Sequence, residues 1–464
     1  MNESSENKKK KNNEYSDSVK WTIAAYAPTL VSDGLQPLFV GGVSKKDFSS
    51  DLVEKELKIF RENWGIIDKE TAYHTMIYLY NDGGNFLSYK TKIGALINEI
   101  YGDRIGEKEK DEKEKRKNIL KKTARIYTLQ RYPEVGIVGN DLTKGLYFTS
   151  CLYLAGIYSF EEAMTISIKM AKKAQNSFKS WDEYMENAFW GAQCEFGSSP
   201  YDSGSSMSKR RNYYYNEREI KNGIYVIDWK TPLIDEWKIS NVLEYPDTIK
   251  WFNAAKALLH VSNGNTPHLF PMGLMDESSK QSSLEMLESG WGIRNRKDAN
   301  ETIHKLSEGK MHNERFLNEY EYIKKNANYN KKFCDLVNLI VENYGDRGIL
   351  AWDLYRAMYL ISACYTVGFY TYEESLNKSL IAAKKIQENF DSWDDYMNNY
   401  FLGYQYWSRD ILKNPLRNPP LPKHGMLDFN ESGTAYRKKL YQWLKNDKDS
   451  VYNISWNTEL KKEW

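Results

Sequence analysis

The chain contains long stretches in which apolar residues recur every three or four positions, a spacing typical of amphipathic helices. Alternating Val and Ile runs, which would indicate strands, are few, and only 12 of the 464 residues are proline. Two segments have the spacing of a helix-starting capping box, Ser159-Phe-Glu-Glu162 and Thr371-Tyr-Glu-Glu374. The pattern predicts an all-α fold.

The helical pattern occurs twice along the chain. Ser180–Asn187 aligns residue by residue with Ser392–Asn399, and both segments read Ser-Trp-Asp-x-Tyr-Met-x-Asn. Upstream, Tyr101-Gly-Asp-Arg104 matches Tyr344-Gly-Asp-Arg347. These matches predict an internal duplication that gives two tandem, structurally similar helical domains.

The matched ends of the two copies set the expected domain boundaries. We expect a disordered N-terminal tail at 1–20, a first repeat domain at 21–232 and a second at 233–464. Because the motif at Tyr101 matches the motif at Tyr344, we expect the first repeat to carry an insertion at about 105–139. Its mixed charges predict a solvated helix or hairpin tip.

Tryptophan positions also recur between the copies. Aromatic residues at repeat-equivalent helical positions normally fill the space between helices, so we expect these tryptophans to pack in the cores. The set comprises Trp64 with Trp291, Trp181 with Trp393, Trp229 with Trp456, and in addition Trp352.

Composition excludes several classes of partner. The chain has 65 basic and 63 acidic side chains, and this near-balance argues against a nucleic acid or a membrane surface as partner. No apolar window reaches the length of a bilayer span, and the first residues lack the apolar core of a signal peptide. The four cysteines are far apart without a C-x-x-C pair, which suits a reducing compartment, and we expect a cytoplasmic protein.

The sequence lacks the familiar catalytic and cofactor motifs. It contains no P-loop, dinucleotide-binding glycine pattern, H-E-x-x-H or G-x-S-x-G elbow. Its six histidines are not retained between the copies, and Glu301-Thr-Ile-His304 lacks the second Glu-x-x-His that a dimetal bundle needs. We therefore expect no catalytic residues, no metal site and no cofactor.

One polar pair recurs in both copies. Asp141 and Lys144, like Asp353 and Arg356, stand three residues apart at the start of an apolar helix, so both side chains share one face. In a ligand site, Arg356 would hold a carboxylate or phosphate and Asp353 would orient it. In a structural ion pair, the acid would stabilise the helix N-terminus and the pair would join this helix to its neighbours. The lysine in the first copy favours the structural interpretation, because a bidentate site does not tolerate Lys in place of Arg.

Three segments of the second copy form a recognisable set. They are Gly348–Ala357 with its Trp-Asp-x-x-Arg motif, Gly368–Glu374, and Phe390–Trp407. Together they resemble the bacterial family known as domain of unknown function 1266. The first copy departs from the motif, with Asn140 in place of the Trp and Lys144 in place of the Arg. The resemblance implies a bacterial origin and a shared fold, and it brings no assigned activity.

Two functions are favoured by the sequence, and its balanced charge permits a third, a purely structural partner of the cell's own assemblies. Duplication of fold-defining residues without a retained catalytic set favours a non-enzymatic protein-interaction module. Such a module would be an adaptor or a toxin-neutralising protein, with a protein partner that the sequence does not identify. The alternative is an enzyme with a polar cleft around Asp353 and Arg356 in the second repeat.

Overall fold

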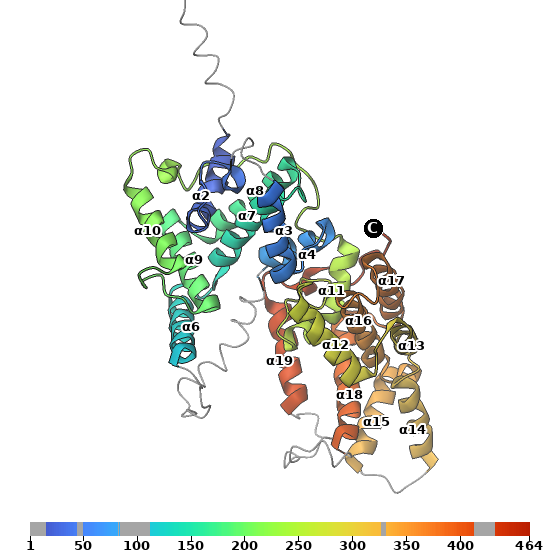
Figure 1. Ribbon diagram of the computed structural model, residues 1–464. Coiled ribbons are helices and arrows are strands. Elements are labelled where there is room, and N and C mark those ends of the chain that lie inside the picture. The colour runs from blue at the N-terminus through green and yellow to red at the C-terminus, as the bar shows by residue number, and fades with distance from the viewer. Residues whose placement is uncertain (1–14, 44–49, 82, 84–111, 326–330, 413–431) are drawn as a thin grey trace, which may run out of the picture. The chain divides into compact units, whose positions relative to one another are not determined.

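The computed structural model describes residues 15–43, 50–81, 83, 112–325, 331–412 and 432–464. Within these ranges the chain forms α-helices and short 3-10 helices and no strand, so the all-α prediction is confirmed (Figure 1). Contacts divide the chain into two units, Met1–Glu244 and Tyr245–Trp464. The connection after Pro232 packs with unit 1, because Leu233 and Leu243 are buried in its hydrophobic core.

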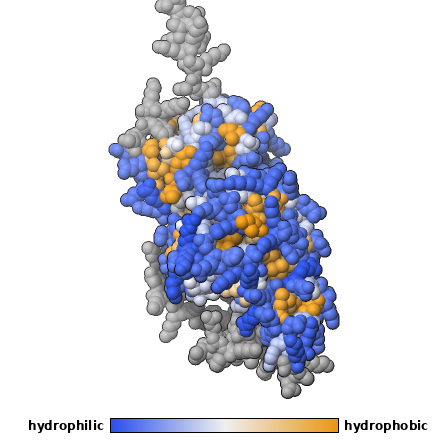
Figure 2. Space-filling view, turned by 90° about the vertical axis from the view of Figure 1, so that its right-hand side faces the viewer, coloured by the Kyte–Doolittle hydropathy of each residue, from blue (hydrophilic) through white to orange (hydrophobic). Residues whose placement is uncertain are grey.

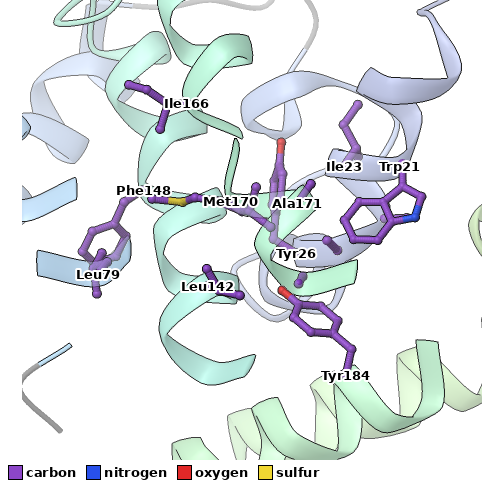
Figure 3. Packing of buried hydrophobic residues seen from close by; sticks show 14 of the residues in the cluster. Trp21, Ile23, Tyr26, Leu79, Leu142, Phe148, Ile166, Met170, Ala171 and Tyr184 are labelled. Atoms are coloured by element: carbon purple, nitrogen blue, oxygen red, sulfur yellow. The ribbon is translucent and has the colours of Figure 1, made fainter. Parts of the chain in front are cut away.

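Unit 1 contains eight described α-helices that surround one core. They are α2 (Asp17–Ser32), α3 (Ser50–Trp64), α4 (Lys69–Tyr80), α6 (Glu112–Arg131), α7 (Val138–Leu154), α8 (Phe160–Ser177), α9 (Trp181–Phe196) and α10 (Ser206–Glu219). Figure 3 shows Trp21 and Tyr26 of α2, Leu142 of α7 and Met170 of α8 in this interior.

Unit 2 repeats this order of helices. Its described helices are α11 (Asp247–Ser262), α12 (Glu277–Trp291), α13 (Arg296–Ser307), α14 (Asn313–Lys325), α15 (Lys331–Tyr344), α16 (Leu350–Thr366), α17 (Tyr372–Asn389), α18 (Trp393–Leu412) and α19 (Ser432–Asn446). The helix starts are repeated too, because Ser159 caps α8 and Thr371 caps α17, each in a complete capping box. These shared elements confirm the predicted duplication.

Each unit contains a cluster of three buried tryptophans. They are Trp21, Trp181 and Trp229 in unit 1, and Trp251, Trp393 and Trp456 in unit 2. The indole nitrogen of Trp21 donates to the carbonyl of Trp229 at 3.1 Å. The same bond, also 3.1 Å, joins Trp251 to Trp456. In both units, therefore, the first helix is fixed to the last segment of the repeat by a buried indole.

A buried asparagine makes a second shared connection. The side chain of Asn187 accepts from the amide of Gly139 at 2.8 Å and donates to the carbonyl of Gly136 at 2.7 Å. Asn399 does the same in unit 2, where it joins the amide of Ala351 and the carbonyl of Gly348. The asparagine satisfies backbone groups at the start of α7 or α16, where the helix itself leaves its first amides unpaired.

The segment expected as an insertion at 105–139 has a counterpart in unit 2. Its described part is α6, which packs on α9 as α15 packs on α18. The hydroxyl of Tyr132, just after α6, lies 3.5 Å from the carbonyl of Glu183, and that of Tyr344, at the end of α15, lies 3.4 Å from the carbonyl of Asp395. Tyr344 thus corresponds to Tyr132, and α6 is a regular element of the repeat. The Tyr101 motif lies outside the described residues.

The surface carries no continuous apolar band on the face drawn in Figure 2, where apolar residues lie in separate patches among hydrophilic ones. Among the described residues, no helix combines the length and the apolar character needed to cross a bilayer.

Candidate functional site

The most unusual polar group in unit 2 is the guanidinium of Arg356, on α16. It lies 4.0 Å from the ring centre of Trp352, 5.2 Å from that of Trp407 and 5.4 Å from that of Trp291. Arg356 is half-buried, its Nε is out of contact with solvent, and this nitrogen has no hydrogen-bond partner. Burial lowers the pKa of Arg356. The rings hold the cation in place by cation–π attraction and offer no hydrogen-bond acceptor to Nε.

A second arginine lies near the first. Arg437, on α19, stacks on Tyr404 at 3.7 Å from the ring centre. Burial raises the pKa of Tyr400, and the charges of Arg356 and Arg437 both oppose that rise. Both cations therefore act on one buried phenol, and we call the group of Trp291, Trp352, Arg356, Tyr400, Tyr404, Trp407 and Arg437 the arginine cage.

Asp353 does not form the expected ion pair with Arg356, although both residues are described. Its carboxylate accepts from the amides of His312 and Asn313, each at 3.0 Å, and from Nδ1 of His312 at 2.6 Å. The imidazole of His312 meets Trp291 and Trp352 edge to face. Asp353 thus orients His312 beside the arginine cage, with Nε2 as the remaining imidazole nitrogen.

The equivalent position in unit 1 holds a neutralised lysine. Lys144 Nζ lies 2.7 Å from Glu195 Oε2 and 3.8 Å from Asp141. Asn140 donates to the same oxygen of Glu195 at 3.0 Å, and Lys144 lies over the ring of Trp64. Along the matched helices, Asn140, Lys144 and Glu195 correspond to Trp352, Arg356 and Trp407.

The second cation is also repeated. Tyr214 of α10 donates to Asp182, and Tyr441 of α19 donates to Asp394, so the two helices align and Arg210 corresponds to Arg437. Arg210 Nε donates to Ser32 at 2.9 Å. Burial lowers the pKa of Arg210 and the nearby charge of Asp33 opposes this.

The two sites differ in the carboxylates near their cations. In unit 1, Asp33 accepts from the hydroxyl of Tyr147 at 2.8 Å. In unit 2 the matching hydroxyl, that of Tyr359, accepts from Asn263 at 2.7 Å. Three acidic residues of unit 1 correspond to uncharged residues of unit 2, namely Asp33 to Asn263, Glu56 to Ser283 and Glu195 to Trp407. Within the described residues, unit 1 therefore has more acidic side chains around its cations than unit 2, where the charge of Asp353 acts on Arg356 without a direct ion pair.

The predicted site residues fall into two groups in the structure. Trp181, Trp229, Trp352, Trp393 and Trp456 are buried, whereas Trp64 and Trp291 are half-buried beside the cations. The sequence pattern does not predict a role for His312, Tyr400, Tyr404 or Arg437. A signal for Arg437 existed, because α10 and α19 both carry an arginine four residues before the tyrosine that bonds to the acid.

Other candidate groups do not assemble into sites. Among the described residues, no three His, Cys, Asp or Glu side chains come together as a metal site would require. Cys151, Cys194 and Cys364 are buried free thiols, and burial raises the pKa of each.

Comparison with known proteins places the repeats in one family. The family model described as "Protein of unknown function (DUF1266)" matches residues 59–228 and 286–456. The chain belongs to this family. The two DUF1266 segments are nearly equal in length, as expected if α6 is a regular element of the repeat.

A curated relative is also uncharacterised. The chain is 25% identical over 183 residues to the uncharacterized protein YbeR of Escherichia coli strain K12, covering 37% of this chain and 75% of the relative. No solved structure matches the chain. These comparisons support the fold assignment and the duplication, and they carry no activity.

Proposed function

We propose that this DUF1266 protein is a non-enzymatic binding protein whose second repeat recognises an acidic side chain of a protein partner through the arginine cage. The observation that carries the proposal is Arg356, a half-buried guanidinium fixed among three tryptophans, with an unpaired Nε and no ion pair to a described carboxylate. Nε itself is closed to solvent, but the side chain as a whole is only half-buried, so an incoming carboxylate would bind the NH2 groups of the guanidinium in a charge-assisted hydrogen bond.

The composition of the arginine cage supports a protein partner. Trp, Tyr and Arg are the residue types that dominate binding energy at protein interfaces. Trp291, Arg356, Tyr404, Trp407 and Arg437 are all half-buried, so each side chain retains some exposure to solvent. In unit 1, the corresponding cation, Lys144, already donates a hydrogen bond to a carboxylate, that of Glu195.

Peptide selection tests this function. Random dodecapeptides displayed on phage would be panned against the full chain, and enriched peptides would be measured by fluorescence anisotropy. We expect peptides rich in Asp and Glu, whose affinity falls at least tenfold in Arg356→Gln and falls with added salt. The matched control is Lys144→Gln, which should not change binding. Selection of peptides without acidic residues, or equal affinity in Arg356→Gln, would contradict the proposal.

A specific observation favours the enzyme as second candidate. Asp353 fixes Nδ1 of His312 as a donor, which is the arrangement that prepares the other imidazole nitrogen for proton transfer. The arginine cage beside it would hold an anionic substrate. This function predicts hydrolysis of p-nitrophenyl acetate or p-nitrophenyl phosphate that is lost in His312→Asn, with the exposed His304→Asn as control. Turnover that persists in His312→Asn would rule out this role for the histidine.

A further inference from the structure

Unit 1 contains a cavity at the position that corresponds to the arginine cage. The cavity has a volume of about 380 Å³ and lies between α2, α3, α7, α9 and α10. Apolar side chains form much of its wall, namely Trp64, Phe148, Met185, Phe189, Phe196 and Met207. Ligand pockets for small molecules are of this size and composition.

The cavity exists because two side chains on α9 are small. Ala188 and Ala192 line it, and the corresponding residues on α18 are Tyr400 and Tyr404. The two phenol rings that belong to the arginine cage in unit 2 therefore have no equivalent in unit 1. Apolar cavities of about 150 Å³ hold a benzene ring, so this larger space accommodates a molecule of two fused rings.

The two charged side chains that line the cavity, Lys144 and Arg210, are cations that already have partners, and Glu195, the acid bound to Lys144, is not itself a lining residue. Lys144 is already bound to Glu195, and Arg210 is bound to Ser32 with Asp33 nearby. A ligand carboxylate would have to displace Glu195 from Lys144 or lie close to its charge, and like charges at such distances repel. An uncharged molecule meets no such cost.

We propose that unit 1 holds a second ligand site, for an uncharged planar aromatic molecule of about two fused rings, and that Glu195 sets this selectivity. This site is separate from the acidic-residue site of unit 2, and the evidence for one does not depend on the other. Duplication has then given one position in the fold two ligand classes, a neutral ring in unit 1 and an anion in unit 2.

A matched pair of probes tests the proposal on the full chain. At pH 7, 2-naphthol is uncharged and 2-naphthoate is an anion of almost the same shape. Methionine methyl NMR would report on the cavity, because Met185 and Met207 line it. We expect saturable shifts of both methyl resonances with 2-naphthol, and at least tenfold weaker binding of 2-naphthoate. Absence of a shift with 2-naphthol, or equal binding of the two probes, would overturn the proposal.

Two variants identify the site and its selectivity. Ala192→Tyr, which introduces the residue of unit 2, should abolish the response to 2-naphthol by filling the cavity. Glu195→Gln leaves the cavity open and removes the charge, so it should bind 2-naphthoate at least tenfold more tightly than the wild type, whereas the exposed Glu161→Gln should not. If Glu195→Gln does not gain affinity for 2-naphthoate, the selectivity assigned to Glu195 is wrong, whatever Ala192→Tyr does.

Discussion

The two repeats place equivalent cations beside an equivalent tryptophan and surround them differently. In unit 1, Lys144 lies near Trp64 and is bound by Glu195. In unit 2, Arg356 lies near Trp291, and Trp407 occupies the position of that acid. The buried hydrogen bonds of Trp21 and Trp251, by contrast, are the same in both units.

The difference shows which parts of a duplicated fold can change. Asn187 and Asn399 each satisfy a buried amide and a buried carbonyl, so replacing either would leave backbone groups unpaired at a cost of about 1–3 kcal/mol each. Side chains around the cations lie partly at the surface, where a change of charge has a smaller cost. Binding properties could therefore diverge while the helices kept their arrangement.

The largest expected effect comes from the shared tryptophans. Trp21→Ala and Trp251→Ala each remove a fully buried indole and its hydrogen bond, and each should destabilise its own unit by about 3–5 kcal/mol. Urea unfolding followed by hydrogen exchange would locate the loss in one unit. Tyr436→Ala, a change at an exposed aromatic, should cost less than about 0.5 kcal/mol. If only one of the two tryptophan variants lost stability, the buried indole would not stabilise both repeats in the same way.

The buried asparagines come next. Asn187→Ala and Asn399→Ala should each lower the free energy of unfolding of their unit by about 2–4 kcal/mol, because two backbone groups lose their partners. Asn398→Ala changes an exposed neighbour on the same helix and serves as the control in the same urea titration. Unequal costs for the two asparagines would mean that the start of α7 and the start of α16 are supported differently.

Acid should destabilise both units through different histidines. Burial lowers the pKa of His74 in unit 1 to about 3, and burial also lowers the pKa of His260 in unit 2. Below about pH 6.5 the unfolded chain binds a proton at His74 that the folded chain does not. Stability should therefore fall by about 1.4 kcal/mol per pH unit as pH decreases toward 3. Hydrogen exchange between pH 7 and 5 would measure this pH dependence of stability in each unit. His74→Leu should make the dependence shallower in unit 1 and leave that of unit 2 unchanged.

Transplanting the acid should abolish the difference between the two sites. Trp407→Glu introduces the residue of unit 1 beside Arg356, so the cation would gain an internal carboxylate. We expect acidic peptides to bind about tenfold more weakly, or about 1.4 kcal/mol. Trp407→Gln separates loss of the ring from gain of the charge, and it should bind more tightly than Trp407→Glu in the same anisotropy assay. Equal binding by the two variants would refute the role given to the missing acid.

The sequence alone predicts the helical fold and the duplication, because capping boxes and the matched Ser-Trp-Asp segments are local signals. The sequence pairs Tyr344 with Tyr101, because the four residues that begin at each position match. In the structure, the packing of Tyr344 is equivalent to that of Tyr132. Helical spacing predicts the Asp353–Arg356 pair. Spacing along one helix cannot show that Asp353 bonds instead to His312, which precedes a different helix.

The most direct test compares the arginines themselves. With arginine side chains labelled with nitrogen-15, the Nε–H resonances of Arg356, Arg437 and Arg210 can be followed while an acidic peptide from the selection is added. We expect saturable shifts for Arg356 and Arg437 and none for Arg210, because the acids of unit 1 already neutralise its site. Shifts of Arg210 alone, or equal shifts in both units, would contradict it.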